Sequence, residues 1–336
     1  MFKKIDEKIN GLLLVIIFPF LLFAMAYYGF ETSYVLWIKS AEKAPDFMFT
    51  SVYAYRVIPN FLSVHVTEIF TYVVENYTPF LKKTLSKSGS YFYHSTFLIN
   101  AFFFILSSII LDKILQLKSA GLLLNSRVRM LVHLLAVFLI VIVQYVPTNC
   151  DLIAIFFYLW GIFLSLQYFH KRETMSLITL CIVIFVSTFV RETACLNIAF
   201  FAAVFFDWNT FKNKDYRSVR DIFFVFAAFC VAYIGLRLSI SQKSSFFEGI
   251  YFLKNFTSFY NLAGLLFGII GFYFSYILCS ESGSKLVFKK FLFFSLPYLA
   301  MITMVGLFWE TRLFLPLILT GIVIASHQFK NFIPNQ

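Results

Sequence analysis

Long runs of apolar residues, separated by short polar turns, recur along almost the whole chain. Each run holds roughly 15–21 residues, close to the ~20 that a helix needs to cross the hydrocarbon core of a bilayer. The pattern therefore predicts an all-α protein, a polytopic transmembrane helix bundle with about ten spans. The expected spans cover residues 11–30, 91–111, 130–146, 152–169, 175–190, 194–208, 222–238, 262–280, 291–309 and 313–327.

One long segment, residues 31–90, departs from this pattern after the first span. Its part from 57 to 81 is apolar but is interrupted by His65, Glu68 and Glu75. Mixed polar and apolar character over such a length is typical of an amphipathic helix that lies on a membrane surface. We expect this helix in the first outer loop. The pattern leaves open the alternative that 57–81 crosses the membrane.

Composition supports a membrane protein of one domain. The chain of 336 residues is 60% hydrophobic and 21% aromatic but only 13% charged, whereas soluble domains carry about 25% charged residues. No internal repeat or linker divides it, so residues 1–336 are expected to form a single transmembrane domain. The net charge of +11 fits basic cytoplasmic loops better than nucleic-acid binding. The five cysteines lie in or beside apolar runs without a C-x-x-C pair, so neither disulfides nor a metal site is predicted.

The distribution of Lys and Arg predicts the orientation in the membrane. With the N-terminus inside, the short inner loops are consistently basic, and the short outer turns carry one Arg or none. Cytoplasmic loops of membrane proteins show this excess of positive charge. Both termini are therefore expected in the cytoplasm.

This orientation brings charged residues from distant parts of the sequence to the outer face. Tight turns and the first outer loop would contribute arginines and carboxylates to one polar cavity. The candidate residues are Asp46, Arg56, Asp151, Arg191, Glu192, Glu310 and Arg312. A single charge at a helix end is more often structural, but several turns on one face here combine Arg with an acid. The alternative is a buried ion network that only joins helix ends.

The turn from Glu310 to Arg312 is the most informative of these features, because apolar runs of membrane length lie on both sides of it. A charge at mid-bilayer costs roughly 2.5–3.5 kcal/mol on insertion scales and less near the interface. The two charges are therefore expected at a membrane surface, with Arg312 as a ligand contact and Glu310 as the residue that orients it.

Several of these motifs resemble a known class of enzymes. They are the run Tyr53-Ala54-Tyr55-Arg56-Val57-Ile58-Pro59, the triplet Arg191-Glu192-Thr193, and the late pattern of Glu310, Arg312 and Pro316. Together with the predicted topology, they resemble bacterial membrane proteins of cell-surface glycopolymer synthesis with a GT-C-type glycosyltransferase architecture. The chain departs from that class in lacking an adjacent pair of acids in the first outer loop and a large soluble C-terminal domain.

The resemblance implies transfer of a sugar from a polyprenyl-phosphate donor to a glycan or lipid-linked acceptor. This would take place on the extracytoplasmic face of the bacterial inner (cytoplasmic) membrane. It also implies a catalytic acid in the first outer loop, for which Asp46 is the first candidate and Glu31 the second. Membrane lipid is an expected partner and nucleic acid is not. No cofactor is expected, and a requirement for a divalent metal is left open.

The chemistry of the candidate residues agrees with such a transfer. A carboxylate can act as a general base toward the acceptor, which typically contributes 10²–10⁴-fold to the rate. Arginine suits a lipid phosphate because its planar guanidinium donates two hydrogen bonds and keeps its charge. We therefore expect Asp46 as the base and Arg56, Arg191 and Arg312 as phosphate and sugar contacts. The acids Asp151, Glu192 and Glu310 would orient these arginines or bind sugar hydroxyls.

Three other functions remain compatible with the sequence. A polysaccharide repeat-unit polymerase would also use outward-facing arginines. A lipid-linked sugar flippase or other transporter would carry charges midway along its spans and often repeated halves, and neither is visible here. A non-catalytic membrane partner of a synthesis complex is the third.

Overall fold

The structure, a computed structural model, describes residue 9 and residues 11–30, 32–117, 125–143, 148–240 and 249–329. All regular elements in these ranges are helices, which confirms the expected all-α bundle. The helices of the first half are η1 (Leu12–Ile17), α2 (Phe18–Gly29), α3 (Ser33–Ser40), η2 (Asp46–Phe49), η3 (Ser51–Tyr55), α4 (Val57–Asn76), α5 (Pro79–Ser88), α6 (Tyr91–Gln116), α7 (Ser126–Val143) and α8 (Asp151–Lys171). Those of the second half are α9 (Thr174–Thr188), η5 (Glu192–Ala194), α10 (Cys195–Phe205), α11 (Trp208–Lys212), α12 (Arg217–Ser239), α13 (Phe252–Thr257), α14 (Phe259–Leu278), α15 (Ser282–Phe294), α16 (Leu296–Val305), η7 (Thr311–Leu313) and α17 (Leu315–Ala325).

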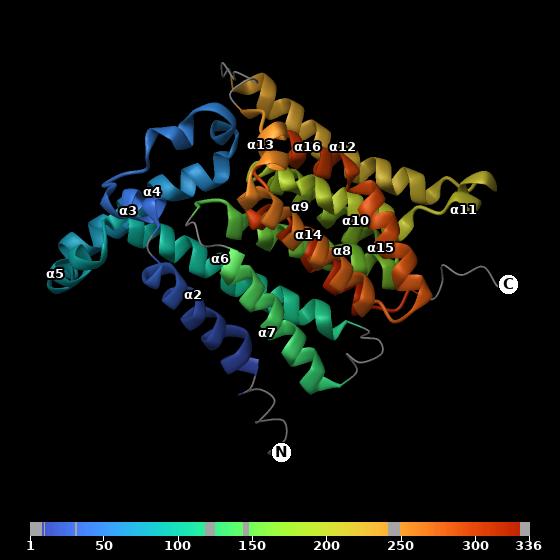
Figure 1. The fold of residues 1–336 in the computed structure, drawn as a ribbon, viewed down its shortest axis with the longest axis horizontal. Helices are drawn as coiled ribbons and strands as arrows, with labels where there is room; N and C mark the ends of the chain where they lie inside the picture. The colour runs from blue at the N-terminus through green and yellow to red at the C-terminus, as the bar shows by residue number, and fades with distance from the viewer. Residues whose placement is uncertain are drawn as a thin grey trace.

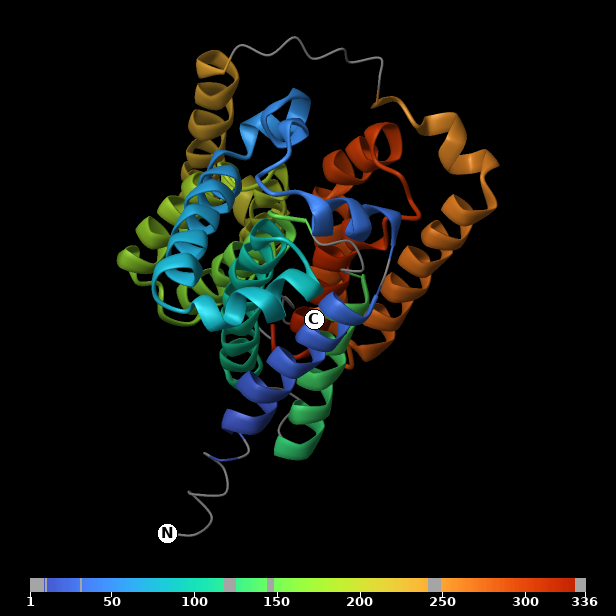
Figure 2. The same ribbon diagram turned by 90° about the vertical axis from the view of Figure 1, so that its left-hand side faces the viewer.

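Three groups of helices pack side by side in the bundle (Figure 1; Figure 2). The first contains α2, α6 and α7, the second α8, α9, α10 and α12, and the third α14, α15 and α17. Contacts of α6 with α8 and of α10 with α15 join the groups. The innermost helix is α17, in which every residue except Ala325 is buried. One continuous apolar core extends from Phe23 in α2 to Phe329.

Seven helices in the described ranges are long and apolar enough to cross a bilayer. They are η1 with α2, and α4, α6, α7, α8, α12 and α14. The bent pair α15 and α16 counts as an eighth if it forms one span, and α9, η5 with α10, and α17 are apolar but shorter. Each predicted apolar run therefore contains a helix, and the bundle is compatible with a polytopic membrane protein.

The predicted span 291–309 differs from the observed helices. The helix begins earlier, at Ser282, and bends by 46° between α15 and α16. Pro297 lies in the first turn of α16. A proline has no N–H to donate and clashes with the preceding helical turn, so it starts a new helix rather than continuing the old one. The basic residues Lys285, Lys289 and Lys290 lie between the predicted spans 262–280 and 291–309, but in the structure they are part of α15.

The amphipathic helix expected at 57–81 is two helices, α4 and α5, because Pro79 begins the second. Helix α4 is not isolated on a surface. Its residues Ile58, Leu62 and Val66 pack on a small apolar cluster that contains Ile99 and Val190. Helix α4 also satisfies the length and hydropathy of a membrane-crossing helix.

Candidate functional site

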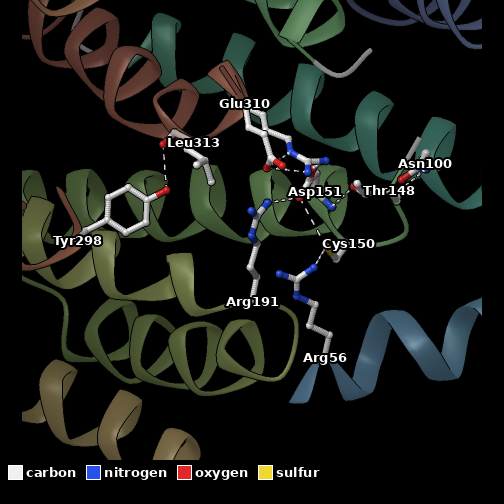
Figure 3. A network of polar contacts seen from close by, with 10 residues as sticks. Arg56, Asn100, Thr148, Cys150, Asp151, Arg191, Tyr298, Glu310 and Leu313 are labelled. Carbon is white, nitrogen blue, oxygen red and sulfur yellow. Dashed lines mark hydrogen bonds and ion pairs between the residues drawn. The ribbon is translucent and has the colours of Figure 1, made fainter. Parts of the chain in front are cut away.

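Four helix N-termini meet at one point in the bundle (Figure 3). Arg56 directly precedes α4, and Asp151 is the first residue of α8. Arg191 precedes η5, which leads into α10, and Glu310 precedes η7, which leads into α17. The N-terminus of a helix carries a partial positive charge and free N–H groups. The polar side chains therefore gather where the backbone itself favours a negative charge.

The carboxylate of Asp151 is the centre of this cluster. Its side chain is only 3% exposed, and Arg191 and Arg312 approach it from two different turns. Arg191 Nη1 donates a hydrogen bond to Oδ1, and Arg312 Nη1 donates to Oδ2 at 3.0 Å. Arg312 also donates from Nε and Nη2 to Oε2 of Glu310, at 3.3 and 2.9 Å. One buried carboxylate thus joins three segments that are far apart in the sequence.

The two arginines remain charged in this environment. Burial lowers the pKa of a guanidinium, because it disfavours the charged form. The Asp151 carboxylate offsets this effect, and the pKa values of Arg191 and Arg312 both lie above the ordinary value for arginine. Glu310 contributes further to the raised pKa of Arg312. Ion pairing therefore holds both cations in the cluster.

Arg56 belongs to the cluster but has no carboxylate partner among the residues that the structure describes. Its Nη1 donates to the Sγ of Cys150 at 3.2 Å, and its guanidinium lies 4.6 Å from the ring centre of Tyr53. Its Nε is buried without a hydrogen-bond partner in the same described region. Buried N–H groups without partners are rare. Arg56 therefore contributes a positive charge and an N–H donor that no described residue satisfies.

A cavity of about 10 Å³ lies beneath the arginines. It is lined by Asp151, Ala154, Ile155, Tyr158, Arg191, Thr193, Arg312 and Pro316. A cavity of this size holds about one water molecule. A phosphate group does not fit there unless side chains move, and Arg56 is not among the lining residues.

Asp46, the expected base, lies in a segment that is connected to the cluster. Its side chain is exposed at the start of η2, and it forms no ion pair with the cluster arginines in the described structure. Asn60 makes the connection. Its Nδ2 donates to the backbone oxygens of Met48 (2.6 Å) and Tyr53 (3.0 Å), and its Oδ1 accepts from Asn149 Nδ2 at 3.0 Å. The short helices η2 and η3 are thus tied to the residue two positions before Asp151.

The structure brings five of the seven candidate residues into direct contact or into a chain of contacts through Cys150 (Figure 3). They are Arg56, Asp151, Arg191, Glu310 and Arg312. Glu192 is half-buried beside them but, in the part of the chain described, forms no ion pair with Arg191. Arg191 pairs with Asp151 instead. Glu31, the second candidate for the base, lies outside the described residues.

A second set of residues, which the sequence pattern did not point to, holds the Glu310–Arg312 turn in place. Asn255 is fully buried, donates from Nδ2 to the oxygens of Thr303 (3.0 Å) and Gly306 (2.8 Å), and accepts from the N–H of Phe308 at 3.1 Å. Asn261 accepts from the N–H of Trp309 at 3.0 Å. An asparagine within an apolar run is the signal that could have revealed them, because a buried amide is costly unless it is hydrogen-bonded.

Two further contacts complete this support. Tyr298 donates from its hydroxyl to the backbone oxygen of Leu313 at 2.9 Å. Gly264 lies so close to the backbone of Phe308 that a Cβ there would overlap its oxygen. Helices α13, α14 and α16 therefore all hold the segment that presents Arg312 to Asp151.

We expect replacement of Asn255 by Ala to lower the free energy of unfolding by about 1–3 kcal/mol, because it leaves buried backbone groups of residues 303–308 without partners. Thermal unfolding of the detergent-purified protein measures this loss. Asn76→Ala is the matched control, because Asn76 is exposed and its side-chain hydrogen bond in the described structure goes to the backbone of its own helix. Equal melting temperatures for both variants would show that Asn255 does not support the turn.

Comparisons with known proteins do not indicate a function for this chain. No protein-family model matches the chain, and neither the curated proteins nor the solved structures show significant similarity to it. The geometry and charge of the cluster therefore have to carry any functional proposal.

Proposed function

We propose that the protein is an integral membrane glycosyltransferase of GT-C type. It transfers a sugar from a polyprenyl-phosphate donor to a glycan or lipid-linked acceptor in cell-surface polysaccharide synthesis. The observation that carries this proposal is the meeting of three arginines and four helix N-termini, where the guanidinium of Arg56 has no carboxylate partner among the described residues. Such a combination attracts an anion, and arginine binds a phosphate group, as it binds a carboxylate, through two parallel hydrogen bonds.

The charges of the cluster support a bound anion. Among the five residues in contact, Asp151 and Glu310 offset two of the three guanidinium charges and leave one positive charge at Arg56. Glu192 lies beside them and forms no ion pair with Arg191 in the described structure. The phosphodiester of a polyprenyl-phosphate sugar carries one negative charge. Its binding would balance the site and give Arg56 Nε the acceptor that it lacks in the described structure.

The proposed reaction uses Asp46 as the general base. The acceptor hydroxyl attacks the anomeric carbon of the donor sugar and gives its proton to the Asp46 carboxylate. The bond between that carbon and the phosphate oxygen breaks, and the electron pair leaves with polyprenyl phosphate. The leaving group gains negative charge, which Arg56, Arg191 and Arg312 stabilise as fixed cations. Asp151 and Glu310 orient the arginines, and Glu192 is available to sugar hydroxyls.

The membrane placement is part of the same proposal. The described helices that are long and apolar enough to cross a bilayer support a multi-pass protein. With about ten spans and both termini in the cytoplasm, as the excess of basic residues in the inner loops favours, the arginine cluster faces the extracytoplasmic side of the bacterial inner membrane. Lipid-linked sugar donors would reach it there.

Binding of a short polyprenyl phosphate to the purified protein tests the proposal. We expect Arg56→Gln to weaken binding roughly tenfold to a hundredfold, because a hydrogen bond to a charged group contributes about 1.5–3 kcal/mol. Isothermal titration in detergent, with geranylgeranyl phosphate as the probe, measures the affinity. Arg56 has no carboxylate partner in the described structure, so its removal leaves no buried charge unpaired and the variant should fold.

The control is Arg127→Gln, which removes an exposed arginine at the start of α7. It should bind the probe as the parent protein does. Lack of binding by the parent protein would rule out the polyprenyl-phosphate donor. Unchanged affinity in Arg56→Gln would remove Arg56 from the site.

A further inference from the structure

We infer that a second site, next to Asp46, binds the carbohydrate acceptor of the proposed transfer. This site is an open cavity of about 530 Å³, separate from the small cavity beneath the arginines. It is lined by Trp37, Ala41, Glu42, Lys43 and Pro45. The inference rests on the proposed function and names the place of the second substrate.

The walls of this acceptor cavity are held by packing on both sides. On one side, α3 buries Val35 and Ile38, which are 2% and 0% exposed. Trp37 lies on the opposite face of this helix. Beyond it, the N–H of Met48 donates to the oxygen of Pro45 at 3.0 Å, and Met48 is buried. The lining residues therefore project from a backbone that the core fixes.

The residue types of the cavity fit a neutral sugar. Trp37 is 48% exposed and presents a flat apolar surface, on which the C–H face of a sugar ring can stack. Glu42 and Lys43 are exposed and offer an acceptor and donors for hydroxyl groups. The charges of Glu42 and Lys43 cancel, so the lining of this cavity has no net charge, in contrast to the arginine cluster. The volume of about 530 Å³ also lies within the roughly 300–1,000 Å³ of typical ligand pockets.

The position of the cavity relates it to both parts of the proposed reaction. Pro45 lines it, and Asp46 is the next residue. Two residues further on, the backbone oxygen of Met48 accepts from Asn60, which is bonded in turn to Asn149 next to Cys150 and Asp151. The same short helix thus joins the acceptor cavity, the proposed base and the arginine cluster. An acceptor bound against Trp37 would bring its hydroxyl to the Asp46 side.

Binding of soluble oligosaccharides tests this inference without any transfer reaction. The probes are tetrasaccharides built from glucose, galactose, mannose, rhamnose or N-acetylglucosamine, and saturation-transfer NMR on the detergent-purified protein detects them. We expect at least one probe to bind the parent protein and its affinity to fall at least tenfold in Trp37→Leu. Glu42→Gln should weaken binding as well, because it exchanges a charged acceptor for a neutral one.

Trp208→Leu is the matched control, because Trp208 is also exposed, at 55%, but lies on α11. It should bind the probes normally. The inference is wrong if none of the probes binds, or if Trp37→Leu only lowers the melting temperature while affinity stays unchanged, as expected for an interfacial anchor.

The outcome is separable from that of the proposed function. Loss of oligosaccharide binding in Trp37→Leu, with unchanged affinity for geranylgeranyl phosphate, supports two distinct sites. Oligosaccharide binding by a protein that binds no polyprenyl phosphate would keep the carbohydrate site and remove the proposed donor. Binding of polyprenyl phosphate without binding of any tetrasaccharide would keep the proposed donor and remove the carbohydrate site.

Discussion

Replacement of Asp151 by Asn is expected to lower the free energy of unfolding by about 3–5 kcal/mol, the usual cost of removing one partner from a buried ion pair. The carboxylate accepts hydrogen bonds from both Arg191 and Arg312, whose side chains are only 12% and 15% exposed. Arg312 keeps Glu310 as a partner, but Arg191 would be left with its charge buried and unpaired. Chemical unfolding of the purified protein in detergent micelles measures the loss.

Asp221→Asn is the matched control for this variant. Asp221 is as buried as Asp151 and accepts hydrogen bonds from Tyr168 at 2.7 Å and from Arg220 at 3.0 Å. The side chain of Arg220, however, is 62% exposed, so water can solvate its charge once the carboxylate is gone. We expect a clearly smaller loss of stability. Equal losses in the two variants would contradict a special role of Asp151 as the shared partner of two buried cations.

Replacement of Asp46 by Asn is expected to slow sugar transfer by 10²–10⁴-fold, the usual contribution of a general base. The amide keeps the shape of the side chain but cannot accept the proton of the acceptor hydroxyl. Asp46 is exposed and forms no ion pair with the cluster arginines in the described structure. Stability and affinity for geranylgeranyl phosphate should therefore remain at the parental level. Glycopolymer output of cells that carry the variant, at matched membrane levels, measures the effect.

Glu68→Gln controls for the loss of an acid from the same long segment, because Glu68 is exposed on α4 and, among the described residues, bonds His65 alone. Its output should equal that of the parent protein. Full output by Asp46→Asn would exclude Asp46 as the base. A fall in anion affinity along with output would show instead that Asp46 acts in donor binding.

Much of the fold could be predicted because membrane segments are recognised from local composition. A run of some twenty apolar residues forms a helix in almost any tertiary context, since its backbone groups must be satisfied within the segment. The runs around Phe20, Phe104 and Phe267 needed no knowledge of their neighbours. The bend at Pro297 and the division between α4 and α5 at Pro79 were less visible, because a single proline either ends or only bends a helix.

Part of the candidate site could also be predicted from local sequence. Arg56, Arg191, Glu310 and Arg312 are charges at the ends of apolar runs, and a common side of the membrane is enough to bring them near one another. Their partners could not be inferred in this way. Arg191 is adjacent to Glu192 in the sequence, but it pairs with Asp151, 40 residues away.

The apolar helices and the charged residues at their ends follow from the local sequence, because hydropathy and the residues that end a helix are properties of neighbouring positions. Which of these charges meet depends on the tertiary structure. Arg312 reaches Asp151 across 161 residues because α8 and α17 pack together, and Asn255 and Asn261 hold the intervening turn. Pairing of this kind depends on how helices are arranged in space, which the local pattern of the sequence does not record.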